Sequence, residues 1–158
     1  MGGEFVVSYW IDSDEWSRAA AARQNPEAEP LFDYFYGRVQ MLVNRRPILG
    51  EHGYEMSVAD LACGMAQVLR SEIAVVGSHD VATFSQGDDS LEIKFERDGE
   101  RVRVSSNLPG TPTGETDVHA FLAGAREFIE RFAREASIRV PDALEWKDLA
   151  GLRDYARS

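Results

Sequence analysis

Apolar and polar residues alternate most regularly between Leu91 and Ser106, which predicts two antiparallel strands. Asp98-Gly99 is a typical two-residue turn, because both of its positions need positive φ. With the turn there, Phe95 is expected to face Val102 and Lys94 to face Arg103. One side of the hairpin then carries only apolar residues and the other only charged ones: Leu91, Ile93, Phe95, Val102 and Val104 against Glu92, Lys94, Glu96, Arg101 and Arg103.

Two earlier segments also have strand patterns. Residues 5–11 alternate with both faces partly apolar, and residues 31–43 place Val39, Met41 and Val43 on one side. Asn44 to Pro47 is a turn that returns the second segment as a short hairpin through Ile48 and Leu49. Residues 50–56 are expected to form a loop.

Apolar residues at three-and-four spacing predict the helices. A short helix follows Ser13 and stops at Asn25-Pro26. A second helix begins at Ser57 and runs to about Glu72, and Thr116 is expected to cap a long third one. A final helix follows Pro141-Asp142. The apolar positions of the long helix and of the final one are Val118, Phe121, Leu122, Ala125, Phe128, Ile129, Phe132, Trp146, Leu149, Leu152 and Tyr155.

The order of these elements is typical of an α+β fold rather than of a parallel α/β one. Strands come first, then a helix, a meander that ends in the Leu91 hairpin, and the remaining helices. We expect an antiparallel sheet with the helices packed on one face. Residues 1–158 are predicted to form a single domain, with an acidic connector near residues 24–30 and a surface connector at residues 107–115.

The chain is strongly acidic, with 27 Asp and Glu, 17 Lys and Arg, and a net charge of −10. The excess lies in residues 1–120, which hold 20 acids and 10 bases, whereas residues 121–158 hold seven of each. Such a surface repels phosphate backbones and anionic lipid, so neither nucleic acid nor a membrane is an expected partner. It suits a basic protein partner, although solubility alone explains the same charge. No signal-peptide pattern or membrane-spanning run is present, which predicts a cytoplasmic protein.

No residue pattern identifies a catalytic centre, a metal site or a cofactor. The three histidines, one of which is His119, lack any zinc-binding spacing. His79 and Asp80 are expected in a loop before a strand, where the carboxylate could orient the ring as a general base. His52 is flanked by acids and a tyrosine and could form one side of a divalent-metal or acid–base site. A solvated polar loop is the simpler explanation of both histidines, and Cys63 has the setting of a small buried apolar residue.

The aromatic residues near the N-terminus exceed what one buried face can hold. Because exposed Tyr and Trp are frequent anchors of protein interfaces, we single out four partner-binding candidates: Trp10, Trp16, Tyr34 and Tyr36. The alternative is that these strands are covered on both faces, by the segment around Trp16 or by the last helix.

From Ser57-Val58-Ala59-Asp60-Leu61 through Phe84 and the Asp98-Gly99 hairpin to the Val118 helix, the order of elements resembles small bacterial toxin-immunity proteins. The resemblance covers roughly residues 57–136 and implies a non-enzymatic acidic module that neutralises a basic protein. Two alternatives stay open. The first is a small enzyme or small-molecule binder with a pocket between sheet and helices, using His79 and Asp80 or His52. The second is a structural homo-oligomer.

Overall fold

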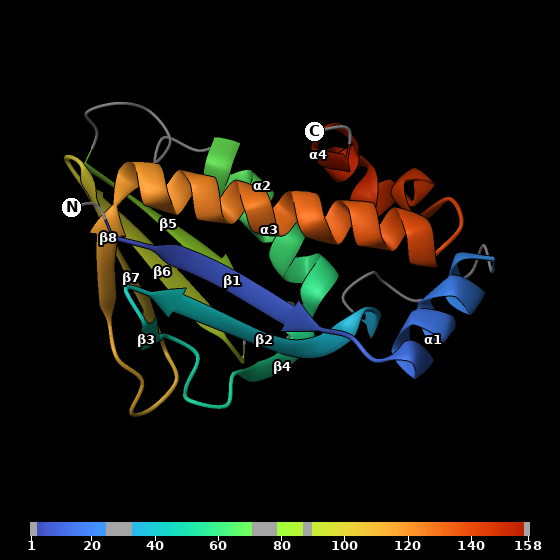
Figure 1. The fold of residues 1–158 in the computed structure, drawn as a ribbon, viewed down its shortest axis with the longest axis horizontal. Coiled ribbons are helices and arrows are strands. Elements are labelled where there is room, and N and C mark those ends of the chain that lie inside the picture. The colour runs from blue at the N-terminus through green and yellow to red at the C-terminus, as the bar shows by residue number, and fades with distance from the viewer. Residues whose placement is uncertain (1–2, 25–32, 71–78, 87–89, 157–158) are drawn as a thin grey trace.

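The computed structural model describes residues 3–24, 33–70, 79–86 and 90–156, with the side chains of His79 and Asp80 left out (Figure 1). The fold is α+β, as predicted, but its strands form two four-stranded antiparallel sheets instead of one. The strands are β1 (Phe5–Trp10), β2 (Tyr36–Val43), β3 (Arg46–Pro47), β4 (Tyr54–Ser57), β5 (His79–Ser85), β6 (Glu92–Asp98), β7 (Arg101–Ser106) and β8 (Gly114–Asp117). The helices are α1 (Ser13–Arg23), α2 (Val58–Arg70), α3 (Val118–Arg139) and α4 (Arg153–Ala156), with two 3₁₀ turns, η3 (Ala143–Glu145) and η4 (Lys147–Leu152).

The first sheet has β2 at its centre, paired with β1, β3 and β4. Trp10 lies opposite Arg38 on β2, and Arg38 lies opposite Glu55 on β4. A turn follows β2 as predicted, but it comprises only Asn44 and Arg45, at φ 49° and 69°, the pattern of a type I′ hairpin. Arg46 and Pro47, predicted to lie in the turn, form the returning strand, and Ile48 and Leu49 lie after it. The expected loop at residues 50–56 is wrong in its second half, because β4 pairs there with Tyr36–Val39.

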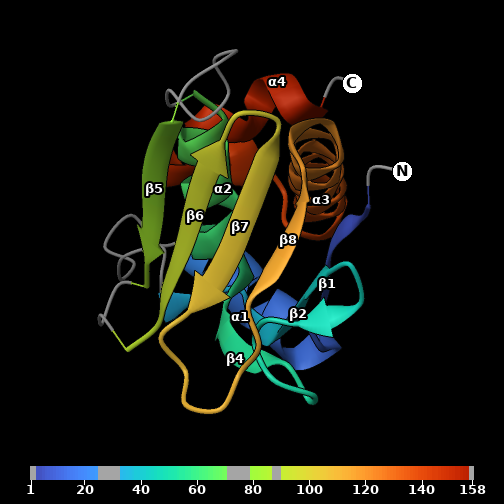
Figure 2. The same cartoon turned by 90° about the vertical axis from the view of Figure 1, so that its left-hand side faces the viewer.

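The second sheet has the order β5-β6-β7-β8 (Figure 2). The predicted hairpin is present, but its turn is displaced by one residue. Asp98 pairs with Arg101, so the loop is Gly99-Glu100, and Phe95 faces Val104 instead of Val102. Positive φ at Gly99 but not at Glu100 fits a type II′ turn.

The predicted sidedness of the hairpin is confirmed despite that displacement. All five of its apolar residues are buried, because moving the pairing by two positions on one strand leaves every side chain on its face. The expected facing of Lys94 and Arg103 is wrong. Lys94 lies opposite Ser105 and pairs with Glu96, at 3.2 Å between Nζ and Oε1.

Helix α3 packs against both sheets, and it is seen end-on in Figure 2. The Phe121 ring contacts Phe5 of β1 at 4.9 Å and Phe95 of β6 at 5.4 Å between centroids. Further along the helix, Phe128 and Phe132 each lie 5.9 Å from the ring of Tyr9. The core is therefore formed between the buried faces of the two sheets and α3, with α2 packed against α3 and β5.

Local hydrogen bonds define where the helices begin. Ser57 precedes α2 as predicted, and its Oγ accepts a bond from the backbone N of Asp60 at 3.2 Å. The cap of α3 is Asp117 rather than Thr116, since the Asp117 carboxylate accepts a bond from Ala120 N at 2.8 Å. Thr116 instead belongs to β8 and is buried.

Other sequence predictions need smaller corrections. His79 and Asp80 begin β5 rather than lying in a loop. The surface connector ends at Thr113, since β8 begins at Gly114. In place of one final helix, residues 143–156 form η3, η4 and the single turn α4. Apart from residue 24, the acidic connector lies outside the described residues.

No helix within the described ranges is both long enough and apolar enough to cross a bilayer.

Candidate binding surface

The exposed side of the first sheet carries an unusual share of the molecule's exposed apolar side chains. Five large apolar residues are exposed among the described ones, and three of them lie on this side: Val6, Trp10 and Tyr36. Strand alternation and the pairing register define the outer face as Val6, Ser8, Trp10, Tyr36, Arg38, Gln40, Leu42 and Glu55. A cluster of this kind on one face is typical of an interaction surface.

A cavity of about 460 Å³ lies at the end of this face where β1 leads into α1. Trp10 and Tyr36 contribute aromatic walls, and Gly37 lies beside them. Four carboxylates and two guanidinium groups complete the lining: Asp12, Asp14, Glu15, Glu55, Arg18 and Arg38. The cavity therefore combines exposed aromatic rings with a net negative charge.

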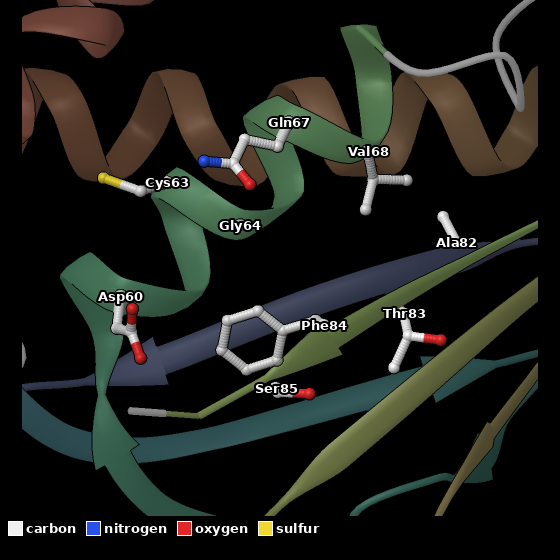
Figure 3. A pocket seen from close by; sticks show the side chains of 9 residues that line it. All are labelled: Asp60, Cys63, Gly64, Gln67, Val68, Ala82, Thr83, Phe84 and Ser85. Atoms are coloured by element: carbon white, nitrogen blue, oxygen red, sulfur yellow. The ribbon is translucent and has the colours of Figure 1, made fainter. Parts of the chain in front are cut away.

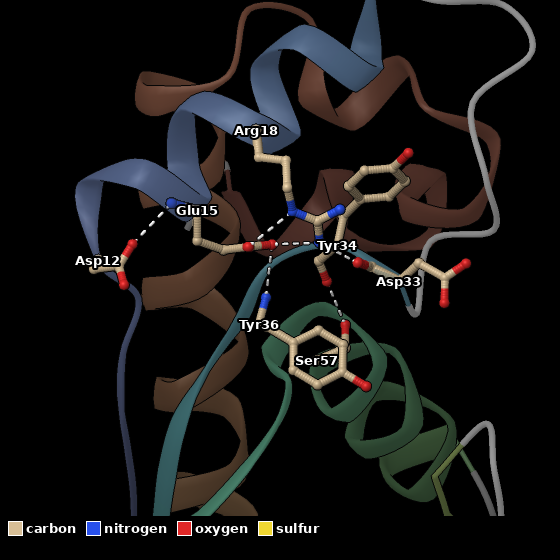
Figure 4. Close-up of polar contacts among 7 residues, drawn as sticks. All are labelled: Asp12, Glu15, Arg18, Asp33, Tyr34, Tyr36 and Ser57. Carbon is tan, nitrogen blue, oxygen red and sulfur yellow. Dashed lines mark hydrogen bonds and ion pairs between the residues drawn. The ribbon is translucent and has the colours of Figure 1, made fainter.

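Glu15 is the centre of the hydrogen-bond network that shapes this cavity (Figure 4). Its carboxylate accepts two bonds from Arg18, both 3.0 Å, and one from the backbone N of Tyr36 at 3.1 Å. Hydrogen bonding to Glu15 raises the pKa of the Arg18 guanidinium. Asp12 caps α1 by accepting a bond from Glu15 N at 2.8 Å. Glu15 therefore joins the first turn of α1 to the start of β2 beside the cavity.

Gly37 allows β2 to approach the end of β1. A Cβ atom at this position would lie 2.2 Å from the backbone oxygen of Trp10, which cannot move without displacing the strand. The absence of a side chain at Gly37 therefore keeps Trp10 beside Tyr36.

Trp10 is the most exposed aromatic residue of this surface, at 72%. The guanidinium of its strand neighbour Arg38 lines the same cavity, where it donates to the His52 carbonyl at 2.6 Å and to Glu55 at 3.1 Å. Within the described part of the chain, the Trp10 ring has neither an aromatic contact nor a cation above it. It is therefore available to a ligand or partner.

Two of the four aromatic candidates belong to the core instead. Trp16 is 4% exposed and lies 5.9 Å from Phe35 and 6.4 Å from Phe132 between ring centroids. Tyr34 is also buried, 5.7 Å from the ring of Trp146. The expectation that all four side chains offer binding surface is thus wrong for Trp16 and Tyr34, because Trp16 packs against Phe132 of α3 and Tyr34 packs against Trp146 of the C-terminal segment.

A second cavity, of about 400 Å³, lies between α2 and β5 (Figure 3). Its polar lining comprises Asp60, Cys63, Gln67, Thr83 and Ser85. Burial raises the pKa of the Cys63 thiol to about 12, and the thiol donates to the Asp148 carbonyl at 3.4 Å. The sulfur is thus a protonated thiol rather than a nucleophile.

Neither of the two histidine side chains that the structure describes, His52 and His119, lines either cavity. His52 is exposed in the loop between β3 and β4 and lines neither space. His79 and Asp80 lie in β5, opposite Asp98 and Arg97 respectively, and their side chains fall outside the description. His119 is exposed at the start of α3, 3.7 Å from a Glu100 carboxylate oxygen.

Among the described residues, no group of three or more His, Cys, Asp and Glu side chains is arranged to hold a metal ion.

Comparison with known proteins returned no relative: no protein family, no curated protein and no solved structure matches this chain.

Proposed function

We propose that this protein is a non-enzymatic binding module that engages a basic protein through the outer face of its first sheet. The observation that carries the proposal is Trp10, 72% exposed beside a cavity lined by four carboxylates and two guanidinium groups. Tryptophan and tyrosine are the residues most often found at the energetic centres of protein interfaces. By the resemblance to toxin-immunity proteins, the partner would be a toxin that the module neutralises.

Charge favours a basic partner over a second copy of this chain. The net charge of −10 attracts a cationic protein at long range and accelerates its association. Two copies meeting through the same acidic cavity would instead bring like charges together. A basic protein can cover the exposed aromatic rings and pair its cationic side chains with the carboxylates around them.

The proposal is tested by immobilising the full chain and passing over it a lysate of the organism that encodes it. We expect one basic protein to be retained at low salt and released as ionic strength rises, because salt screens the attraction. Replacing Trp10 by Ala is expected to weaken retention by about tenfold or more, the loss typical of an interface hot spot.

The matched control is Ile138→Ala, which removes an apolar side chain 82% exposed on α3, the helix that packs against the opposite face of β1. That variant is expected to retain the partner fully. Retention of nothing, retention insensitive to salt, or equal retention by Trp10→Ala would each contradict the proposal. Light scattering of the protein alone at several concentrations tests the homo-oligomer. A mass that rises with concentration, and falls in Trp10→Ala, would assign the outer face to a second copy.

A further inference from the structure

We infer that the side chain recognised at this surface is an arginine of the partner, stacked on Trp10 and paired with the carboxylates around it. This inference rests on the proposed function, and it names the chemical group that the cavity binds. The occupant is a guanidinium group rather than an ammonium group or an apolar side chain.

The first support is that other aromatic rings of this chain are in cation–π contact with its own arginines. Four of them lie under an arginine: Tyr34 under Arg18 at 4.5 Å, Tyr9 under Arg131 at 5.1 Å, Trp16 under Arg139 at 5.8 Å and Tyr155 under Arg126 at 5.9 Å. Trp10 is more exposed than Tyr9, Trp16 or Tyr34, yet no described cation lies above it. Since indole is the strongest cation–π acceptor among the side chains, Trp10 offers the best unfilled site of this type.

The second support is that the nearest internal arginine is unavailable. Arg38 lies directly across the strand pair from Trp10, where its guanidinium would otherwise reach the ring. Glu55 and the His52 carbonyl hold it away, at 3.1 and 2.6 Å. No described arginine therefore covers Trp10, which leaves this position to an arginine of another molecule.

The third support is the acidic group that such an arginine would meet. Asp14 lines the cavity, is exposed in the first turn of α1, and forms no ion pair with any described residue. Asp12 is the cap at the start of the same helix, and the Glu55 side chain is 70% exposed. A planar guanidinium can stack on indole and donate to a carboxylate at its edge at the same time, which a compact ammonium cannot do.

The test uses blocked peptides of equal length made of arginine, of lysine and of citrulline, the uncharged analogue of arginine. Binding is followed by the indole N–H signals of the three tryptophans in an ¹⁵N-labelled sample of the full chain. The signal of Trp10 is assigned by its loss in Trp10→Phe. We expect the arginine peptide to shift that signal and to leave Trp16 unmoved, because Trp16 is buried.

The lysine peptide is expected to bind several-fold more weakly, and the citrulline peptide not to shift Trp10 at all. Trp10→Ala and Asp14→Asn are each expected to weaken the arginine peptide, by about tenfold for the former. Ile138→Ala serves as the control and keeps full affinity. Because Trp10 and Asp14 are exposed, both variants are expected to fold.

Two results overturn the inference. One is an arginine peptide that leaves the Trp10 signal in place. The other is a lysine or citrulline peptide that binds equally well. If either occurs while the Trp10→Ala bait still loses the basic protein, the arginine inference fails and the proposed function stands. If the Trp10→Ala bait keeps the basic protein, the proposed function itself fails.

Discussion

At the residue scale, burial determines which reactive groups of this chain can react. Cys63 combines a part-buried position on α2 with a bond to the Asp148 carbonyl, and burial raises its pKa to about 12. Compared with an ordinary thiol of pKa about 8.5, the thiolate fraction at neutral pH is lower by roughly three orders of magnitude. The thiol should therefore be unreactive in the folded protein.

We predict that iodoacetamide alkylates Cys63 at neutral pH at least about a hundredfold more slowly than free cysteine, and that unfolding in denaturant removes this protection. Mass spectrometry of timed samples measures the rate. A matched exposed thiol is made by Ile138→Cys in a Cys63→Ser background, because position 138 is 82% exposed. Equal rates at the two positions would mean that Cys63 is open to solvent.

Tyr9 is a second buried titratable group at the residue scale. Burial, and then its 2.6 Å bond to Glu135, raise its pKa above the ordinary value. The folded state then holds the phenolic proton more tightly than the unfolded chain does. The stability that this contributes is present below about pH 10 and is lost as the pH rises further.

We predict that the free energy of unfolding, measured by urea titration, falls as the pH rises above about 10, and falls less steeply in Tyr9→Phe. At neutral pH that variant should lose about 1 kcal/mol, because the hydrogen bond is gone while the part-exposed Glu135 can bind water. Wild type and variant with the same slope above pH 10 would exclude Tyr9 as a source of the pH dependence. Cys63 titrates in the same range, and its presence in both proteins cancels in the comparison.

At the element scale, α3 begins directly after β8, and the last two residues of that strand, Thr116 and Asp117, differ in their contribution to stability. The Asp117 carboxylate caps the helix, and the Thr116 hydroxyl is buried without a described partner. We predict that Asp117→Ala lowers stability by about 1 kcal/mol, the usual cost of losing a cap. Thr116→Val should be neutral or stabilising, because it replaces an unpaired buried hydroxyl by a methyl group of the same shape. Thermal unfolding of the two variants side by side checks the assignment, and a destabilised Thr116→Val would show that the hydroxyl has a partner.

Elements that are determined by the pattern of neighbouring residues could be predicted from the sequence, whereas an element that is determined by pairing with another strand could not. Alternation found β1, β6 and β7, and three-and-four spacing found α2 and α3. The β6–β7 turn was misplaced because Asp98-Gly99 and Gly99-Glu100 both supply a glycine. Arg97, buried beside the turn, donates to the Gly99 carbonyl at 2.8 Å. Strand β4 was missed since its four residues are defined only by pairing with β2, far earlier in the chain.

The difference between local patterns and tertiary contacts also explains which parts of the candidate site could be predicted. Composition pointed to exposed aromatic residues near the N-terminus, and Trp10 and Tyr36 are exposed. No local pattern could separate them from Trp16 and Tyr34, because these two are buried by α3 and by the C-terminal segment. The acidic lining of the cavity was equally hidden, since it joins residues of α1 to Glu55 on β4.

At the scale of the whole molecule, Asn44 connects the two sheets. Its side chain accepts a bond from Glu4 N at 2.7 Å and donates to the backbone carbonyl of Glu115 on β8. The neighbouring turn residue, Arg45, shares the positive φ, but its side chain forms no such bond to a described residue. Phe121 joins the same two sheets in the core, so Asn44 is the polar counterpart of that contact at the surface.

The pair Asn44 and Arg45 separates turn strain from contact between the sheets. Glycine adopts the left-handed backbone of either position without strain, so both substitutions preserve the turn. Asn44→Gly also removes the bond to Glu115 on the second sheet and the bond from Glu4 beside β1, and is predicted to lower stability by about 1–2 kcal/mol. Arg45→Gly removes only strain and should range from neutral to about 1 kcal/mol more stable. Urea unfolding followed by tryptophan fluorescence measures both variants. If they change stability equally, the Asn44 side chain contributes nothing to joining the sheets.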